Sequence, residues 1–275
     1  MTAFEHELAA WGPDSPCFQG TDAPVSLDEA HAYCRKIALG HYENFPVVSW
    51  ALPRELRQHF YNVYAFCRWA DDLGDEIEDA DQSLQLLAFD DLIQAFEQDQ
   101  RVGEYRTFTE LLSYCQRSAN PVGRLVLHLC QTVTEETVAW SDSICTGLQL
   151  ANFWQDVARD FAIGRIYIPR EDCEQFGYTR AQFEHNEFNT AFQNLMAFEV
   201  QRARQYLLNG VPLIAQLPGR LQVDIDLFIQ GGLKILDHIE QQQFNVWKQR
   251  PQVSRFEFGL LLFQSLLRRF SGRNR

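Results

Sequence analysis

The sequence predicts an all-α protein built as a single domain. Apolar residues recur at helical spacing along almost the whole chain, and the alternating pattern of a half-buried strand is absent outside the stretch RIYIP at 165–169. No Ser/Gly-rich or Pro-rich linker, internal repeat or low-complexity tract interrupts the 275 residues. We therefore expect a loosely structured N-terminal segment at 1–25, one helical domain at 26–270 and a basic tail at 271–275.

Capping and breaker residues place the individual helices. Ser26 and Glu29 form a capping box that begins a helix running to about residue 39, and Pro53 suits the first turn of a second helix that reaches about residue 79. Further helical segments are expected at about 82–99, 105–117, 121–139, 142–162, 187–209, 219–246 and 253–270. Pro169 and Gly177 mark the longest irregular region, where the rim of a functional site is expected.

Charge and cysteine usage limit the class of protein. A formal charge of −13 argues against nonspecific binding of nucleic acid, which needs a basic surface. The 7 cysteines contain no CxxC pair, so they predict neither a disulfide framework nor a zinc site, and they indicate a reducing compartment. No leader segment and no membrane-spanning run are recognisable, which predicts a cytoplasmic protein.

The C-terminus leaves two interpretations open. Four arginines follow the apolar run FGLLLFQSLL, at Arg268, Arg269, Arg273 and Arg275. Such a basic tail could make peripheral contact with anionic lipid of the inner membrane. Alternatively, the run is an amphipathic last helix that packs on the core and ends in solvent.

Two aspartate pairs with the same spacing are the strongest signal in the chain. Asp71 and Asp75 lie in ADDLGDE, and Asp156 and Asp160 lie in WQDVARD. At i, i+4 spacing each pair places both carboxylates on one helical face, where like charges repel by roughly 3 kcal/mol at an effective dielectric of about 20. Oxygen-only sites of this kind suit Mg²⁺ that shares its ligands with phosphate oxygens. The duplicated pair therefore predicts a diphosphate clamp.

Each pair belongs to a longer polar stripe. The first stripe adds Tyr64 and Arg68, and a guanidinium one turn before two carboxylates can bind a phosphate directly. The alternative is a surface ion pair between Arg68 and a neighbouring aspartate. The second stripe is polar within an apolar helix and consists of Gln149, Asn152, Asp156 and Asp160. Arg165 and Tyr167 follow it directly and could close over the diphosphate.

These motifs resemble those of a known family. YAFCRWADDLGDE and LQLANFWQDVARDFAIGRIYIP resemble the two signature motifs of the squalene/phytoene synthase family, over about residues 26–265. HYENFPVVSWALPRELR and YCQRSANPVGRLVLHL look like its bacterial hydroxysqualene synthase branch, which serves hopanoid biosynthesis.

The resemblance implies an isoprenoid-synthase-type bundle with a central apolar cavity and both aspartate motifs at its mouth. It further implies Mg²⁺ as cofactor, held by Asp71, Asp75, Asn152, Asp156 and Asp160. The implied diphosphate-binding residues are His41, Asn44, Phe45, Arg68, Gln149, Asn152, Arg165 and Tyr167, with Tyr64 beside them in the catalytic set. The implied partners are presqualene diphosphate as substrate, and presqualene diphosphate synthase and hydroxysqualene dehydroxylase as pathway neighbours.

How the reaction ends depends on a different stretch. Relatives usually carry small apolar residues where this chain has Ser118, Ala119, Asn120 and Pro121. Proline inside a helix frees the carbonyl of Arg117, so Asn120 and that carbonyl could hold the water that traps the carbocation as an alcohol. Alternatively, Pro121 simply starts a new helix capped by Asn120.

The expected activity is therefore hydroxysqualene synthase, a carbon-oxygen lyase that acts on a diphosphate. The runner-up is a prenyltransferase that condenses two prenyl diphosphates into presqualene diphosphate, squalene or phytoene. A non-catalytic relative that acts in assembly is the alternative of a different class. A di-iron bundle is disfavoured because the chain contains no Glu-x-x-His pair.

Overall fold

The structure is a computed structural model that describes residues 26–40, 54–75, 98, 101–219 and 221–271. Contacts within the chain group it into two compact units, Met1–Arg101 and Val102–Arg275. The single domain at 26–270 stays a prediction. Most of the described residues are helical. The one strand-type backbone pairing among them is an isolated parallel bridge between Glu104 and Ile166. The all-α prediction is therefore confirmed, and RIYIP contributes only this bridge.

Two helices of the first unit are described. α2 spans Leu27–Gly40 and α3 spans Arg54–Asp75, and the two pack against each other. The predicted capping box is confirmed, because the backbone N–H of Ser26 donates to Glu29 Oε2 at 2.9 Å and the backbone N–H of Glu29 donates to Ser26 Oγ at 3.2 Å. Trp69 of α3 donates from its indole nitrogen to the hydroxyl of Tyr33 of α2 at 2.7 Å. This contact fixes the middle of α2 to the C-terminal half of α3.

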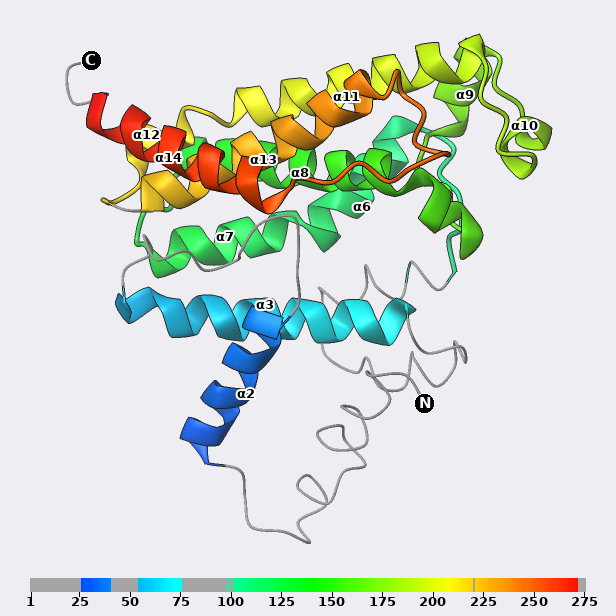
Figure 1. The fold of residues 1–275 in the computed structure, drawn as a ribbon. Coiled ribbons are helices and arrows are strands. Elements are labelled where there is room, and N and C mark those ends of the chain that lie inside the picture. The colour runs from blue at the N-terminus through cyan, green and yellow to red at the C-terminus, as the bar shows by residue number, and fades with distance from the viewer. Residues whose placement is uncertain (1–25, 41–53, 76–97, 99–100, 220, 272–275) are drawn as a thin grey trace, which may run out of the picture. The chain divides into compact units, whose positions relative to one another are not determined.

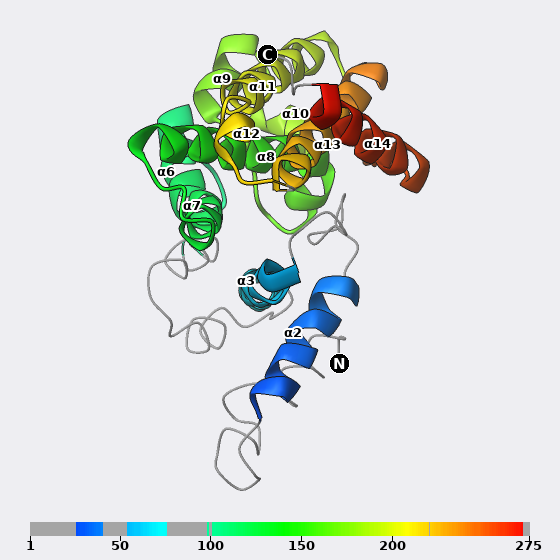
Figure 2. The same cartoon turned by 90° about the vertical axis from the view of Figure 1, so that its left-hand side faces the viewer.

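The second unit surrounds one long helix. Figures 1 and 2 show α8 enclosed by the helices that pack on it, α6, α7, α11, α12 and α13. The helices of this unit are α6 (Phe108–Ser118), α7 (Asn120–Leu129), α8 (Glu135–Ala162), α9 (Arg170–Phe176), α10 (Arg180–Glu184), α11 (Thr190–Asn209), α12 (Leu213–Gln216), α13 (Leu221–Gln241) and α14 (Arg255–Ser271). Within the described residues, no helix combines the length and the apolar character needed to span a bilayer.

Glycines allow the central helices to approach closely. A Cβ atom at Gly147 of α8 would lie 2.8 Å from the Leu207 backbone nitrogen of α11, and one at Gly232 of α13 would lie 2.9 Å from Leu148 Cδ2 of α8. Leu207 itself is fully buried. The three helices α8, α11 and α13 therefore form the packed centre of this unit.

Several predicted boundaries need correction. One helix at 121–139 is wrong: α7 ends at Leu129 and α8 begins at Glu135. Gln131 adopts the left-handed backbone conformation with φ of 54°, and Thr134 and Thr137 then cap α8 reciprocally. The expected start of the next helix at 142 is wrong for the same reason. The segment expected to reach 246 ends at Gln241, because Gln243 and Phe244 also have positive φ.

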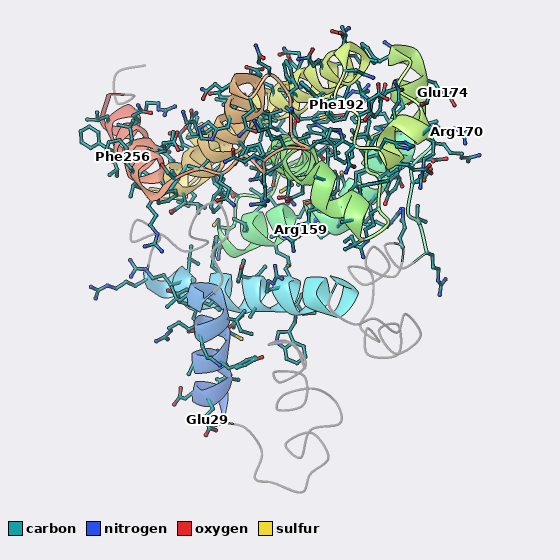
Figure 3. The ribbon with its side chains drawn as sticks, turned by 45° about the vertical axis from the view of Figure 1, so that its right-hand side comes forward. Glu29, Arg159, Arg170, Glu174, Phe192 and Phe256 are labelled. Atoms are coloured by element: carbon teal, nitrogen blue, oxygen red, sulfur yellow. The ribbon has the colours of Figure 1, made fainter. Side chains whose placement is uncertain are left out.

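The irregular region contains short helices that the sequence pattern did not predict. These are α9 and α10, and α12 was likewise not expected. α9 ends at Gly177, whose φ of 69° is the left-handed conformation that glycine adopts easily at a helix end. Its outer face is polar, with Arg170 and Glu174 paired at 3.0 Å (Figure 3). The helix expected at 82–99 lies outside the described residues except for its position 98.

Candidate active site

α8 carries the second polar stripe in the predicted register. Gln149, Asn152, Asp156 and Asp160 all lie on this helix, between the buried residues Leu150, Phe153, Trp154 and Val157. The stripe is not uniform in exposure. Asn152 is exposed and Gln149 and Asp160 are partly buried, whereas Asp156 is only 6% exposed. Because a buried carboxylate needs a compensating charge, Asp156 requires a partner.

That partner is Arg250, from the connection between α13 and α14. Its Nε lies 2.5 Å from Asp156 Oδ1 and its Nη2 lies 2.9 Å from Oδ2, which is a two-point ion pair. The side-chain amide of the preceding residue on α8, Gln155, donates to the carbonyl of Pro251 at 2.5 Å. Arg250 is not among the site residues that the sequence predicted. The only signal was that a buried aspartate needs a cation, and this requirement cannot select one of 21 arginines.

Asp160 lies at a different position, on a small pocket. The pocket has room for about one water molecule and is lined by Phe153, Val157, Asp160, Arg165, Ile166, Tyr167, Ile168 and Phe183. The backbone N–H of Arg165 donates to the Asp160 carbonyl at 2.8 Å, which turns the chain back at the end of α8. The structure therefore brings together three of the predicted site residues, Asp160, Arg165 and Tyr167.

Tyr167 is held by a buried aromatic cluster. Its ring stacks on Phe153 with centroids 3.9 Å apart and an interplanar angle of 8°. Tyr105 and Tyr114 pack on it at 5.9 and 6.0 Å, and all four rings are buried. Aromatic rings pack favourably at such separations, so Tyr167 has a fixed ring position.

Backbone hydrogen bonds fix the segment Arg165–Ile168 that follows α8. Ile166 donates to the carbonyl of Gly103 at 2.7 Å, and Arg170 donates to the carbonyl of Tyr105 at 2.9 Å. Each bond joins this segment to the stretch before α6. The segment that carries Arg165 and Tyr167 is thus anchored near both of its ends.

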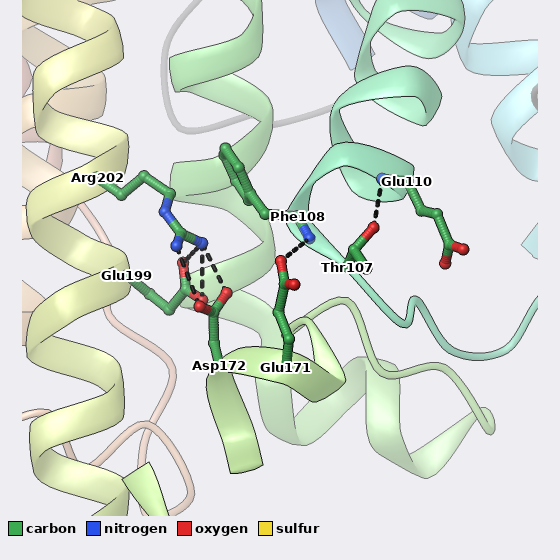
Figure 4. A network of polar contacts seen from close by, with 7 residues as sticks. All are labelled: Thr107, Phe108, Glu110, Glu171, Asp172, Glu199 and Arg202. Atoms are coloured by element: carbon green, nitrogen blue, oxygen red, sulfur yellow. Dashed lines mark hydrogen bonds and ion pairs between the residues drawn. The ribbon is translucent and has the colours of Figure 1, made fainter. Parts of the chain in front are cut away.

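A buried polar network anchors α9 directly after this segment (Figure 4). Arg202 of α11 contacts Asp172 at 2.7 and 3.1 Å and Glu199 at 3.1 Å, and its guanidinium lies 3.9 Å from the centre of the Phe108 ring. Glu171 accepts the backbone N–H of Phe108 at 2.7 Å. Burial, despite the opposing effect of Arg202, raises the pKa of Glu199 well above its ordinary value, with further contributions from Asp172. The first turn of α9 is therefore fixed to α6 and α11.

The first polar stripe lies on α3, as predicted. Tyr64, Arg68, Asp71 and Asp75 fall within its bounds at helical spacing, and Tyr64 and Arg68 are partly buried. The side chains of Asp71 and Asp75 lie outside the described residues, as do His41, Asn44 and Phe45 entirely. The facing of the two aspartate pairs, the central apolar cavity and the clamp that both imply stay predictions.

Asn120 and Pro121 lie at the start of α7. α6 ends at Ser118, so Pro121 is in the first turn of a new helix and not inside a continuous one. Kinking of a continuous helix is therefore wrong. Asn120 is buried, and its Oδ1 accepts a hydrogen bond from Thr146 Oγ1 of α8 at 3.2 Å. Within the described part of the chain, the nearby Ser118 hydroxyl is buried without a hydrogen-bond partner.

The oxygen groups on α8 fit a magnesium site in which α8 supplies some of the ligands but not all of them. Asp156, Asp160 and Asn152 offer carboxylate and amide oxygens, the ligands that Mg²⁺ prefers. Among residues with described side chains, no three or more His, Cys, Asp or Glu groups gather closely enough to hold a metal ion alone. Substrate oxygens and water would have to complete the shell, as is usual for Mg²⁺ bound with a phosphate.

Comparison with known proteins supports the predicted resemblance. The squalene/phytoene synthase family model matches residues 38–90 and 77–257. The chain is 27% identical over 287 residues to a phytoene synthase from Arthrospira platensis, covering 87% of this chain and 92% of the relative. It is 27% identical over 245 residues to a hydroxysqualene synthase from Sinorhizobium fredii, covering 76% of this chain and 83% of the relative.

A solved structure is similar as well. The crystal structure of squalene synthase HpnC from Alicyclobacillus acidocaldarius matches with a TM-score of 0.72 and 38% identity, over 81% of this chain and 97% of that chain. This similarity confirms the isoprenoid-synthase type of helical fold. The chain belongs to the squalene/phytoene synthase family, whose members are enzymes that act on prenyl diphosphates.

Proposed function

We propose that this enzyme is a hydroxysqualene synthase, which converts presqualene diphosphate and water into hydroxysqualene and diphosphate. The observation that carries the proposal is the polar end of α8, where the Arg250 guanidinium binds Asp156 and where Arg165 lines the same pocket as Asp160. This combination of carboxylates and fixed cations is suited to a substrate that carries a diphosphate.

The first step breaks the bond between carbon and the diphosphate oxygen, and the electron pair leaves with the diphosphate. Bound Mg²⁺ would neutralise negative charge that develops on the departing oxygens. Asp71, Asp75, Asn152, Asp156 and Asp160 would hold it. Arg68, Arg165 and Arg250 would contact diphosphate oxygens, and Gln149, Tyr64 and Tyr167, with His41, Asn44 and Phe45, would orient the group.

The second step adds water to the carbocation. We propose that Asn120 positions this water: the oxygen of the water forms the new carbon–oxygen bond, and one proton of the water passes to solvent. The buried hydroxyl of Ser118 supports a polar position here, because a buried hydroxyl without a protein partner favours a bound water. Thr146 fixes the orientation of the Asn120 side chain. Full alcohol yield from both Asn120→Ala and Asn120→Gly, without new hydrocarbon products, would contradict this role.

A condensing activity is the second candidate. The match to a phytoene synthase over 92% of its length favours a prenyltransferase that joins two prenyl diphosphates, as does the squalene synthase HpnC structure. A non-catalytic role in assembly is disfavoured because all four motif aspartates are present.

Cellular location and pathway neighbours belong to the same proposal. A cytoplasmic enzyme would pass its product to hydroxysqualene dehydroxylase and receive substrate from presqualene diphosphate synthase. Peripheral contact with the inner membrane is supported by an exposed apolar stripe on α14, formed by Phe256, Leu260, Phe263 and Leu267 (Figure 3 labels Phe256). The opposite face of α14 packs on α13 and buries Ser265.

Product analysis tests the proposed reaction. Purified enzyme is incubated with Mg²⁺ and presqualene diphosphate, without any nicotinamide, and separately with farnesyl diphosphate. Hydroxysqualene from presqualene diphosphate is the expected result. Squalene that appears only with added NADPH, or condensation products from farnesyl diphosphate alone, would favour the second candidate.

A matched pair of variants ties the product to the site. Asp160→Asn removes one carboxylate from the pocket at the end of α8 and is expected to lower the rate by at least about a hundredfold. Asp142→Asn changes an aspartate on the same helix that pairs with Arg124 of α7, and it is expected to keep the rate.

A further inference from the structure

Three consecutive residues between α13 and α14 are each held by a different contact. These residues, Arg250, Pro251 and Gln252, are called the strap below. The side chain of Arg250 binds Asp156, and the carbonyl of Pro251 accepts from Gln155. The carbonyl of Gln252 lies 3.0 Å from Nδ1 of His238 on α13. Two of the contacts reach α8 and the third reaches α13.

The surroundings of His238 determine its charge in this arrangement. Its second ring nitrogen, Nε2, lies 2.8 Å from Oε1 of Glu257 on α14. A backbone carbonyl and a carboxylate both accept hydrogen bonds and donate none. Both bonds can therefore form only when both ring nitrogens carry protons, which makes His238 an imidazolium.

The charged groups around His238 support this state. Glu257 is held ionised, because hydrogen bonds from the Ser254 backbone and side chain and from His238 lower its pKa to about 2. Lys234 Nζ of α13 contacts the same carboxylate oxygen at 3.3 Å. On α11, Arg204 pairs with Asp237 and Glu240 beside His238 on α13. Asp156 of α8, which Arg250 compensates, lies against the first residue of the strap.

We propose that His238 is a positioning residue: as an imidazolium it fastens the strap and thereby sets the place of the Arg250 guanidinium against Asp156. The inference rests on the proposed function only in taking Asp156 as part of the diphosphate site. Loss of one proton leaves His238 a single donor, so one of its two contacts is lost. A side chain at position 238 that cannot donate in both of these directions should therefore release the strap.

Hydrogen exchange measured by mass spectrometry tests the fastening. The readout is the protection factor of a peptide that spans the strap, corrected for intrinsic exchange. His238→Gln replaces two opposed ring donors by a single amide group, so protection is expected to be roughly tenfold lower than in the unaltered protein under the same conditions.

Two further variants make the test specific. Glu257→Gln supplies an amide donor to Nε2, so a neutral His238 can keep both contacts and protection is expected to stay close to that of the unaltered protein. His185→Gln removes a histidine of the same unit that bonds only to its own helix, and it is expected to behave like the unaltered protein. Equal protection of the strap in the unaltered protein and in His238→Gln would overturn the proposal.

Calorimetric binding of Mg²⁺ with inorganic pyrophosphate tests the positioning role. His238→Gln is expected to bind roughly tenfold more weakly than His185→Gln. Equal affinities in these two variants would overturn the positioning role. If the unaltered protein binds no pyrophosphate, the proposed function fails and the positioning role with it, while the exchange data still show whether His238 fastens the strap.

Discussion

Removal of the Arg250 guanidinium should destabilise the second unit measurably. Breaking a buried ion pair by removing one partner costs about 3–5 kcal/mol, because the other charge is left buried. Asp156 is nearly inaccessible, but the Arg250 side chain is 35% exposed, so water reaches the pair from one side. For Arg250→Met we therefore expect a loss of about 2–3 kcal/mol in the free energy of unfolding.

Urea unfolding followed by circular dichroism measures this loss. The comparison needs Arg250→Met, Asp156→Asn and the double variant. The double variant should lose about 1–2 kcal/mol less than the sum of the single variants, because the neutral amide no longer needs a cation.

Arg124→Met is a matched control. Arg124 also makes a two-point contact with an aspartate of α8, Asp142, but the side chains are 48% and 22% exposed. An exposed pair contributes about 0.2–1 kcal/mol. The reasoning is refuted if Arg250→Met loses no more stability than Arg124→Met, or if the double variant shows no coupling.

Three further predictions concern the core. Because the pKa of Glu199 is raised, the unaltered protein loses stability as pH rises above the unfolded-state pKa of 4.5. Compared with the unaltered protein, Glu199→Gln should therefore be neutral or stabilising at pH 7 and less favourable at pH 4. Thermal melts that show a large loss of stability at both pH values would contradict this. Gly147→Ala should lower the free energy of unfolding by about 1–3 kcal/mol. Gly259→Ala, with nothing within 4 Å of the added Cβ, should raise it by about 0.5–1 kcal/mol. Denaturant melts that rank the two variants in the opposite order would refute the packing argument. Burial raises the pKa of Cys115 and Cys145 to about 12, so neither thiol should react with a thiol reagent at neutral pH unless the protein is unfolded. Mass spectrometry locates the labelled cysteines. Rapid labelling of either thiol in the native protein would contradict the prediction.

Helix type was predictable because its signals are local. Ser26 and Glu29 are three residues apart, and their capping box appears as expected. The break before α8 was not predictable with the same ease, because Gln131 adopts a left-handed conformation that glycine or asparagine would usually signal. Thr134 and Thr137 then close the cap through hydroxyl groups, without the Glu or Gln of the usual motif.

In the candidate site too, local features were predictable from the sequence and long-range contacts were not. The spacing of Asp156 and Asp160 predicts one helical stripe, and α8 carries it. Arg250 was not predictable, because it lies 94 residues from Asp156 in sequence and no local pattern connects them. Long-range partners depend on how α8 and α13 pack, which single-sequence periodicity does not determine.

The two aspartates of the second motif have unequal environments, although the sequence presents them as equivalent. Asp156 is buried with both oxygens bound by Arg250, so any metal ion at this carboxylate must share or displace the guanidinium. Asp160 lies partly exposed at the pocket with Arg165. A cation that approaches from solvent therefore meets less resistance at Asp160. It follows that Asp160 is the more accessible first ligand.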